Sequence, residues 1–444
     1  MSLPAQSSNV PASDSSSSRR EFMKTTGAVV AAGAVAAELS IARGAYAGGS
    51  DTLKIGLVGC GGRGNGAALQ ALKADKNVKL VAMGDAFEDE VEKAHKVLTT
   101  NGELAARIDV PKERRFVGFD AYKKVCDAGI DVVLLATPPH FRPEHMEYAV
   151  KQGLHIFAEK PVAVDAQGVH RVLAAGAEAK KKNLAVVSGL CWRYDYGVRA
   201  AMEQIQQGAI GETVAVHAQY NTPGLPKWPM AARGEKWSDM EYQLRNWYYY
   251  TWLSGDGIVE QAIHSLDKAA WIMKDEAPIS CMSLGGLQSR LAPHRGNIFD
   301  HHSVVYEYAG GVRVFFNSCQ IEGVSGEVST FAMGSKANMQ LEKQMLSTRD
   351  GKSLWRYKGA KNTMHQTEHD ELFAGLRSGT IINNTEYMAK STMLAIMGRM
   401  ASYTAKKITW EQAMNSQEDL TPTEYAWGSL PEPKIAIPGA TKFV

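Results

Sequence analysis

The sequence has few cysteines, almost no net charge and no long hydrophobic run, and each shortage excludes a class of protein. A net charge of +2, with no dense Lys/Arg stripe, excludes a nucleic-acid-binding surface. No apolar run approaches the roughly 20 residues that a transmembrane helix needs. The five cysteines lack the paired spacing of a disulfide framework or a zinc site. They are Cys60, Cys126, Cys191, Cys281 and Cys319.

The rest of the composition is that of a globular protein. Hydrophobic residues make up 45% and charged residues 22% of the chain, which is too apolar for disorder. A length of 444 residues, at about 100–200 residues per domain, is enough for two or three domains with cores of their own. The order of the residues along the chain then narrows the choice of fold and function.

Residues 1–47 have the pattern of an export signal. Arg19 and Arg20 precede Phe-Met-Lys, an apolar segment follows at 27–37, and Ala-Tyr-Ala at 45–47 suits cleavage. The paired arginines are typical of the twin-arginine pathway, which exports folded proteins. The alternative is a disordered Ser/Ala tail with two chance arginines. We therefore expect recognition by the twin-arginine machinery and a periplasmic protein without a membrane span.

A dinucleotide-binding fingerprint follows the signal. The apolar strand predicted at 53–58 leads into Gly59-Cys-Gly61-Gly-Arg-Gly64, then a helical pattern, and a second strand ends at Asp85. The glycines allow a tight turn, close approach to a pyrophosphate and close helix packing. Asp85 can accept both adenosine ribose hydroxyls and would repel a 2′-phosphate, which favours NAD over NADP. The predicted cofactor contacts here are Gly59, Gly61, Gly62, Arg63, Gly64 and Asp85.

Strands and helices continue to alternate up to residue 190. Strands are predicted at 131–136, 155–158 and 184–188, and helices at 143–152 and 165–182. This alternation predicts a doubly wound parallel sheet of the Rossmann type over 50–190. Ligands bind such sheets at the carboxyl ends of the strands. Cofactor contacts are accordingly predicted at Thr137, Pro138 and His140, and at Glu159 and Lys160.

Several further blocks give the chain a family resemblance. They are Glu159-Lys160-Pro161, Cys191-Trp192-Arg193-Tyr194, Gly208-Ala-Ile-Gly211-Glu, Gly255 to Asp267, and His365-Gln-Thr-Glu-His369. Together with the fingerprint they resemble the glucose–fructose oxidoreductase, inositol dehydrogenase and rhizopine-catabolism (Gfo/Idh/MocA) family. The resemblance implies a second α+β domain at 191–444, built on a large, mostly antiparallel, open-faced sheet. It also implies sugar, inositol or polyol substrates.

The resemblance implies catalytic roles for Lys160 and His264. Lys160 would contact substrate and nicotinamide ribose, and His264 would be the acid/base. Histidine suits that role because its ordinary pKa lies close to neutral pH. Glu260 stands where the family usually has Asp, and on a continuous helix it would share a face with His264 and orient the imidazole. It can instead bond a substrate hydroxyl.

Substrate contacts are predicted in an aromatic-rich segment. The candidates are Arg193, Tyr194, Trp247 and Tyr248. Aromatic faces pack on sugar C–H groups, and hydroxyl and guanidinium groups bond sugar hydroxyls. Domain core and subunit interface are the alternatives, because both are also rich in aromatic residues.

The C-terminal half is predicted to contain strands followed by helices. A hairpin is expected at 303–308 and 312–317. His301 and His302 precede it, but adjacent histidines on a strand point to opposite faces, so no metal site is predicted. Residues 420–444 carry four prolines and suggest an extended tail. An open sheet face seldom stays exposed, so a homo-oligomer, dimer or tetramer, is expected.

Together these features predict an exported NAD-dependent oxidoreductase acting on a secondary hydroxyl or ketone of a sugar, glycoside or polyol. Little free nicotinamide exists outside the cytoplasm, so we expect a tightly bound cofactor that is recycled in place. Two alternatives remain: an NAD-dependent glycoside hydrolase working by transient oxidation and elimination, and a non-catalytic sugar-binding module.

Overall fold

A six-stranded parallel sheet lies in the N-terminal part of the described chain. The computed structural model describes residues 51–444 except 225–229, 235 and 291–294, so the predicted export signal lies outside it. The strands have the order β3-β2-β1-β4-β5-β6, and all their pairings are parallel. They are β1 (Leu53–Val58), β2 (Val78–Asp85), β3 (Arg115–Val117), β4 (Val132–Leu135), β5 (His155–Ala158) and β6 (Val186–Ser188). This order confirms the predicted Rossmann-type sheet. The sequence order of the strands reverses between β1 and β4, which is the topological switch point of the sheet.

Helices cover this sheet in two groups. They are α2 (Gly62–Ala74), α3 (Glu88–Thr99), α4 (Ala121–Cys126), α5 (Arg142–Lys151) and α6 (Ala166–Lys181), with short 3-10 turns at Gly102–Arg107, Lys112–Arg114 and Pro139–Phe141. Helices α2 and α3 adjoin each other, as do α4, α5 and α6. Local chemistry fixes their ends: the Asp165 carboxylate accepts from the Gly168 amide at 2.7 Å and so caps α6.

A nine-stranded, mostly antiparallel sheet forms the C-terminal half, as predicted. Its order is β14-β13-β12-β11-β7-β10-β9-β8-β15, and only β7 and β10 pair in parallel. The strands are β7 (Thr213–Thr222), β8 (Ser280–Gly286), β9 (His301–Glu307), β10 (Arg313–Gln320), β11 (Glu327–Gly334), β12 (Asn338–Gln340), β13 (Met345–Ser347), β14 (Ser353–Arg356) and β15 (Ile408–Thr409). The predicted hairpin is β9–β10.

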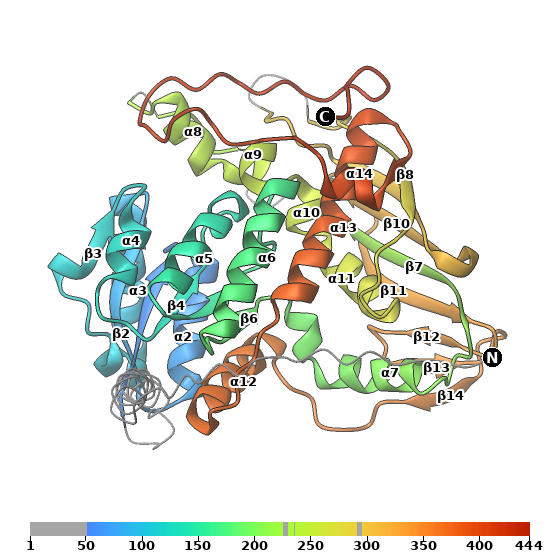
Figure 1. Cartoon of the computed structure of the whole chain (residues 1–444), viewed down its shortest axis with the longest axis horizontal. Coiled ribbons are helices and arrows are strands. Elements are labelled where there is room, and N and C mark those ends of the chain that lie inside the picture. Colours follow the sequence, from blue (N-terminus) through green and yellow to red (C-terminus); the bar gives the residue numbers. More distant parts are fainter. Residues whose placement is uncertain (1–50, 225–229, 235, 291–294) are drawn as a thin grey trace, which may run out of the picture. The chain divides into compact units, whose positions relative to one another are not determined.

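Among the described residues, helices cover only one face of the second sheet (Figure 1). Helices α11 and α13 pack on it, so Val314 and Phe316 of β10 are buried while Phe315, between them, is 42% exposed. The helices are α7 (Tyr196–Gln206), α8 (Asp239–Arg245), α9 (Thr251–Ser254), α10 (Gly257–Glu260), α11 (Ile263–Ile272), α12 (Met364–Ser378), α13 (Thr385–Thr404) and α14 (Trp410–Met414). Shorter 3-10 turns lie at Cys191–Tyr194, Trp247–Tyr249 and Ala309–Gly311.

Two late helices join the halves. Helix α12 packs on α2, where Gln366 Nε2 donates to the Gln70 carbonyl at 2.9 Å and Arg377 pairs with Asp75 at 2.6 Å. Helix α13 is buried around nearly its whole circumference and contacts both α6 and β8. A continuous hydrophobic core therefore runs from one sheet to the other.

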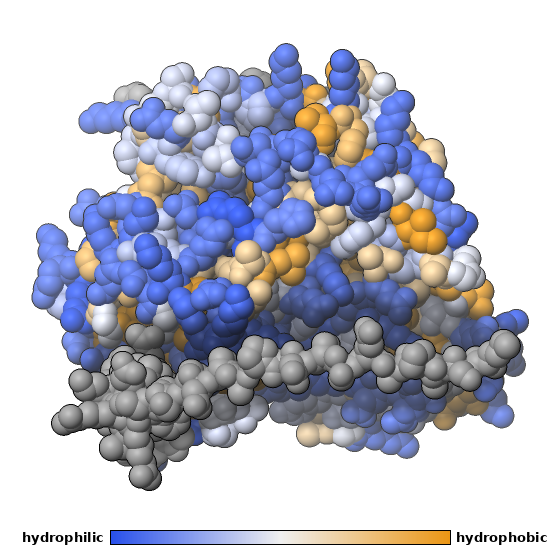
Figure 2. Space-filling model, viewed as in Figure 1, coloured by the Kyte–Doolittle hydropathy of each residue, from blue (hydrophilic) through white to orange (hydrophobic). Residues whose placement is uncertain are grey.

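The face seen in Figure 2 is predominantly hydrophilic, with hydrophobic residues in small groups. Among the described residues, no helix is both long and apolar enough to cross a membrane.

Candidate functional site

The glycine-rich loop between β1 and α2 has the geometry that its sequence predicts. Gly59 has φ +95°, and a Cβ there would lie 2.6 Å from the Ala136 backbone. A Cβ on Gly64 would lie 1.9 Å from the Gly59 carbonyl oxygen. Gly61 and Gly62 face open space, and the first turn of α2 carries no acidic residue or side-chain cap. Unpaired amides at such a helix start bind phosphate.

Asp85 fastens this loop to the end of β2. Its Oδ2 accepts from the Cys60 amide at 2.7 Å and its Oδ1 from the Phe87 amide at 3.1 Å. Burial raises the pKa of Asp85. The carboxylate thus lies beside the loop at the carboxyl end of β2, where the adenosine ribose of a dinucleotide would lie. Loop, helix start and Asp85 together fit a dinucleotide cofactor.

Arg142 holds the loops after β4 and β5 together. Its guanidinium donates to the Thr137 carbonyl at 2.5 Å and to the Pro161 carbonyl at 2.6 Å. Burial lowers the pKa of Arg142 to about 10. Of the predicted residues here, Thr137 lies beside this junction, whereas His140 bonds Tyr425 of the C-terminal tail at 2.7 Å. The loop after β4 therefore contacts the C-terminal tail as well as the parallel-sheet domain.

A charge network joins the glycine-rich loop to Glu159. The Arg63 guanidinium pairs with Glu159 and, at 2.9 Å, with Glu368 of α12. Glu368 is fully buried, and burial raises its pKa well above the ordinary value. Burial also acts to raise the pKa of Glu159, but Arg63 and Lys160 lower it overall. Arg63 therefore ties the cofactor loop to the strand end that carries Lys160.

Lys160 and Glu260 meet across the two halves of the molecule. Lys160 Nζ donates to Glu260 Oε1 at 2.9 Å and to the Glu260 carbonyl at 2.5 Å. Each side chain is 11% exposed. Because both are nearly dehydrated, their attraction is screened far less than that of a surface pair.

His264 lies near this pair but not as first expected. Glu260 ends α10 and His264 lies in α11, so the two are not on one continuous helix, and the carboxylate of Glu260 binds Lys160. The single continuous helix on which the two residues would share a face is therefore not formed, because α10 ends at Glu260 and α11 begins at Ile263. Within the described chain, His264 Nδ1 has no hydrogen-bond partner. Burial, then Lys160, Lys268 and His365, lower the pKa of His264 well below its ordinary value.

An aromatic and amide wall lies beside Glu260. Tyr248 OH donates to Gln320 Oε1 at 2.8 Å, and Gln261 Nε2 donates to Tyr220 OH at 2.8 Å. Burial and the nearby Glu260 raise the pKa of Tyr248. Trp247, half-buried, packs edge-on against Tyr248 with ring centroids 5.8 Å apart. These neutral donors and acceptors suit hydroxyl groups.

Arg193 and Tyr194 are engaged elsewhere. The Arg193 guanidinium, over the Tyr387 ring, pairs with Asp267 at 2.8 Å and Asp275 at 2.5 Å. The Tyr194 hydroxyl donates to Asn384 Oδ1 at 2.7 Å. The geometry therefore favours a packing role for both over the expected substrate contacts, because their polar atoms are already satisfied by the protein.

His301 and His302 point to opposite sides of β9, as the strand pattern predicts. His301 Nδ1 lies 2.8 Å from Asp300 and is partly exposed, whereas His302 is buried with Nε2 3.0 Å from Asp256 Oδ1. Across the described residues, no group of three His, Cys, Asp or Glu side chains has the arrangement of a metal site.

The structure adds residues that sequence reasoning did not select. Arg142, Glu368 and Asp256 bind the site's loops together, and Tyr425 reaches His140 from the tail. His365 was noticed only within a motif, yet it acts on the pKa of His264. Residues that are 305 positions apart, as Arg63 and Glu368 are, carry no local signal of their contact.

This site, at the carboxyl ends of a parallel sheet with a dinucleotide fingerprint, defines a dinucleotide-binding protein of the Rossmann type. Comparison with known families agrees. Residues 53–188 match the model described as "Oxidoreductase family, NAD-binding Rossmann fold", and residues 198–340 match the GFO/IDH/MocA C-terminal domain. The chain belongs to the Gfo/Idh/MocA family and is an oxidoreductase that acts on CH–OH groups.

The chain is similar to individual relatives in sequence and to solved structures in fold. Inositol 2-dehydrogenase of Serratia proteamaculans is 26% identical over 66% of this chain and 79% of the relative. Glycosyl hydrolase family 109 protein 1 of Bacteroides thetaiotaomicron is 27% identical, over 38% of this chain and 34% of the relative. The solved myo-inositol 2-dehydrogenase of Lactobacillus plantarum superposes with a TM-score of 0.60 at 19% identity, covering 81% and 99% of the two chains.

Proposed function

We propose that this protein transfers a hydride between a secondary carbon of a sugar, glycoside or polyol and an NAD cofactor that stays bound between turnovers. The observation that carries the proposal is the Lys160–Glu260 pair at 2.9 Å, next to an imidazole whose pKa is lowered. The relatives named inositol 2-dehydrogenase support a polyhydroxy substrate. Neutral polar side chains at Tyr248 and Gln320 suit such a ligand.

Each site residue has a distinct task in this proposal. Bound nicotinamide supplies the hydride acceptor. His264, neutral because burial disfavours its charged form, accepts the hydroxyl proton. Lys160 Nζ, positioned by Glu260, donates to the reacting oxygen and stabilises its developing negative charge. In the reverse direction the protonated His264 returns its proton to the carbonyl oxygen.

NAD is favoured over NADP by charge. Asp85 ends β2, where this fold binds the adenosine ribose, and Glu88 and Asp89 begin the following helix. Three carboxylates close to that position make a further dianion unfavourable. Their charge supports binding of an unphosphorylated adenosine ribose.

We also propose a periplasmic location and a homo-oligomeric state. The pattern of residues 1–47 supports twin-arginine export to the periplasm, and therefore a retained cofactor. A row of side chains on the open sheet face supports a homo-oligomer. Met282, Val305 and Phe315 are cross-strand neighbours there, and Met282 and Phe315 are 54% and 42% exposed.

The decisive experiment examines the cofactor before any substrate. Purified protein is denatured and its supernatant assayed for NAD and NADP; we expect close to one NAD per chain. Adding inositols and sugars to intact protein should then reduce the bound cofactor once per chain, and a ketose or inosose should reoxidise it. Lys160→Met should retain the nucleotide but lose the reduction. Absence of nucleotide, with no binding on titration, would refute the proposal.

A redox-assisted glycoside hydrolase is the second candidate. The match to glycosyl hydrolase family 109 protein 1 favours it, while the intact Glu159-Lys160-Pro161 motif favours the dehydrogenase. The two differ in their net reaction. Aryl glycosides would release the aglycone without net accumulation of reduced cofactor only if the hydrolase cycle operates.

A further inference from the structure

The C-terminal tail crosses the carboxyl ends of the parallel sheet. We call residues 418–432 the strap. At its start Glu418 pairs with Arg399 of α13, and the Leu420 amide donates to Asp165, beyond β5, at 3.3 Å. Tyr425 then bonds His140, beyond β4, at 2.7 Å. The strap therefore passes over the loops at which a dinucleotide binds this fold.

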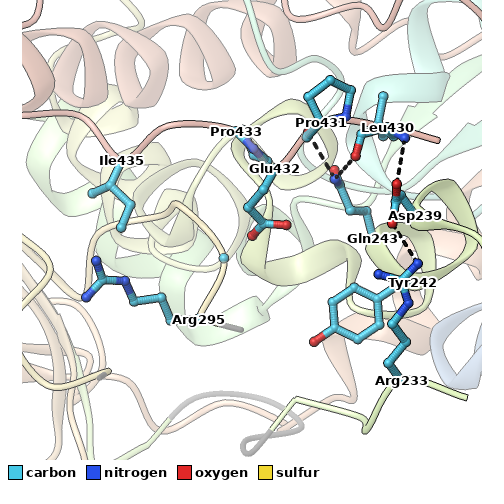
Figure 3. Close-up of a pocket in the computed structure, with 11 residues that line it drawn as sticks. Arg233, Asp239, Tyr242, Gln243, Arg295, Leu430, Pro431, Glu432, Pro433 and Ile435 are labelled. Atoms are coloured by element: carbon cyan, nitrogen blue, oxygen red, sulfur yellow. Dashed lines mark hydrogen bonds and ion pairs between the residues drawn. The ribbon is translucent and has the colours of Figure 1, made fainter. Parts of the chain in front are cut away.

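The far end of the strap is fastened to α8. The Met240 amide donates to the Gly428 carbonyl at 3.2 Å, and the Leu430 amide donates to Asp239 Oδ2 at 3.2 Å. Gln243 Nε2 donates to the carbonyls of Leu430 and Pro431 at 3.4 and 3.3 Å (Figure 3). These contacts border a separate cavity of about 520 Å³ that includes no predicted site residue. In Figure 1 the dark red tail accordingly runs from α14 to α8.

Between these two attachments Trp427 lies on the loops after β2 and β3. Its ring centroid is 4.7 Å from that of Phe119 and 5.5 Å from that of Phe87. Phe87 is the residue whose amide binds Asp85. Trp427 nevertheless remains 47% exposed, although it is a large aromatic residue with two aromatic neighbours. Its position is thus next to the expected adenosine end of the cofactor site.

A groove of about 470 Å³ lies at this place. Its lining includes Phe87, Glu88, Asp89, Glu241, Arg245 and Trp427. Arg245 lies 4.1 Å over the Phe87 ring and is paired with Asp89 at 3.0 Å and Glu241 at 2.9 Å, so its charge is already compensated. The groove thus offers an aromatic wall and carboxylate acceptors. A flat, uncharged heteroaromatic ring with an exocyclic amine matches both.

We propose that Trp427, with Phe87, binds the adenine ring of the dinucleotide, and that the strap keeps the cofactor from leaving. The inference rests on the proposed retention of a dinucleotide. It adds the residues that hold the adenine end. Because the strap is attached at both ends, it must move away before the adenosine half of the cofactor can dissociate. Trp427 is the side chain whose contacts oppose this movement.

The test compares ligands that carry the adenosine end of the cofactor with a ligand that carries its nicotinamide end. Binding of 5′-AMP, ADP-ribose and nicotinamide mononucleotide to nucleotide-free protein is measured by calorimetry in the wild type, Trp427→Ala and Trp427→Phe. Loss of one aromatic stacking partner should weaken 5′-AMP and ADP-ribose by about ten-fold or more and leave nicotinamide mononucleotide unchanged. Trp427→Phe should recover most of the loss. NADH release, followed by fluorescence, should accelerate by a similar factor.

A matched variant controls for loss of any tryptophan. Trp355 is partly buried on β14 of the other sheet, and Trp355→Ala should leave all three ligands and NADH release unchanged. Tyr425→Phe, which deletes the hydroxyl that binds His140, should also hasten NADH release. Equal ADP-ribose affinity and equal NADH release in folded Trp427→Ala and wild type would overturn the proposal. None of these measurements requires turnover, so they hold whether or not a sugar is oxidised.

Discussion

Lys160 Nζ lies 2.9 Å from Glu260 Oε1, although the two residues are 100 positions apart and belong to different halves of the fold. Lys160 follows β5 of the parallel sheet, and Glu260 ends α10 beneath the antiparallel sheet. The pair fixes the spacing between the cofactor loops and the predicted substrate wall. Glu260 therefore has a defined partner, even though it replaces the usual family Asp.

This pair should show a large energetic coupling. Removing one member of a nearly buried ion pair leaves an uncompensated charge, so Lys160→Met or Glu260→Leu should each lower the unfolding free energy by about 3–5 kcal/mol. The double variant should lose much less than the sum. Chemical denaturation of nucleotide-free protein measures all four states. Simple additivity would contradict a direct pair.

The imidazole of His264 should be neutral well below its ordinary pKa. Burial and then Lys160 lower that pKa, and a base works only when unprotonated, so oxidation should persist below pH 6.5 and fail as pH drops through the lowered value. Lys160→Met should move the pKa upward. NMR titration of the ring measures this without turnover, and His264→Asn identifies the signal. A wild-type pKa at or above 6.5 would be inconsistent with the proposal.

Asp256 should be essential for holding α10 in place. It adopts φ +88°, a backbone conformation that favours glycine. Its carboxylate accepts from the Phe299 amide at 2.8 Å, His302 at 3.0 Å and the Tyr403 hydroxyl at 2.5 Å. These partners outweigh burial and lower the pKa of Asp256, so its stabilising effect is present above the ordinary carboxyl pKa and is lost as pH falls through the lowered value.

Asp256→Asn should therefore lower the unfolding free energy by about 3 kcal/mol or more at neutral pH. Turnover should also fall, because α10 carries Glu260, while NAD content stays the same. Asp120→Asn is the matched control: its ion pair with Lys124 is exposed and should cost about 1 kcal/mol or less. Equal effects of the two substitutions would exclude a special role for Asp256.

The open face of the antiparallel sheet should be a subunit contact. Phe315→Glu places a charge in the middle of the exposed row and should shift an oligomer to monomer, as measured by light scattering with size-exclusion chromatography. Val97→Glu, on the 45% exposed Val97 of α3, should not. A wild-type protein that is monomeric at all concentrations would disprove the assignment.

Much of the fold could be predicted because its signals are local. Strand β1 and strand β5 fall where the apolar runs at 53–58 and 155–158 indicate, and α5 and α6 match the helices predicted at 143–152 and 165–182. The glycines at 59 and 64 could be predicted because a Cβ at either position would collide with neighbouring backbone atoms. The break between α10 and α11 was missed, because residues 257–267 are compatible with one helix and the positive φ at Asp256 depends on remote partners.

The sequence by itself determined the parallel sheet, the dinucleotide loop and Asp85 at the end of β2. Each of these depends on spacing along the chain, and short-range sterics and hydrophobic periodicity fix such patterns. Lys160 and His264 were singled out by the family resemblance. Only the tertiary structure decided that Glu260 binds Lys160, that Arg193 is held by Asp267 and Asp275, and that Trp427 lies beside Phe87. Those contacts join segments far apart in the chain. Packing of the two sheets around α13 brings them together, and no local pattern encodes their distances.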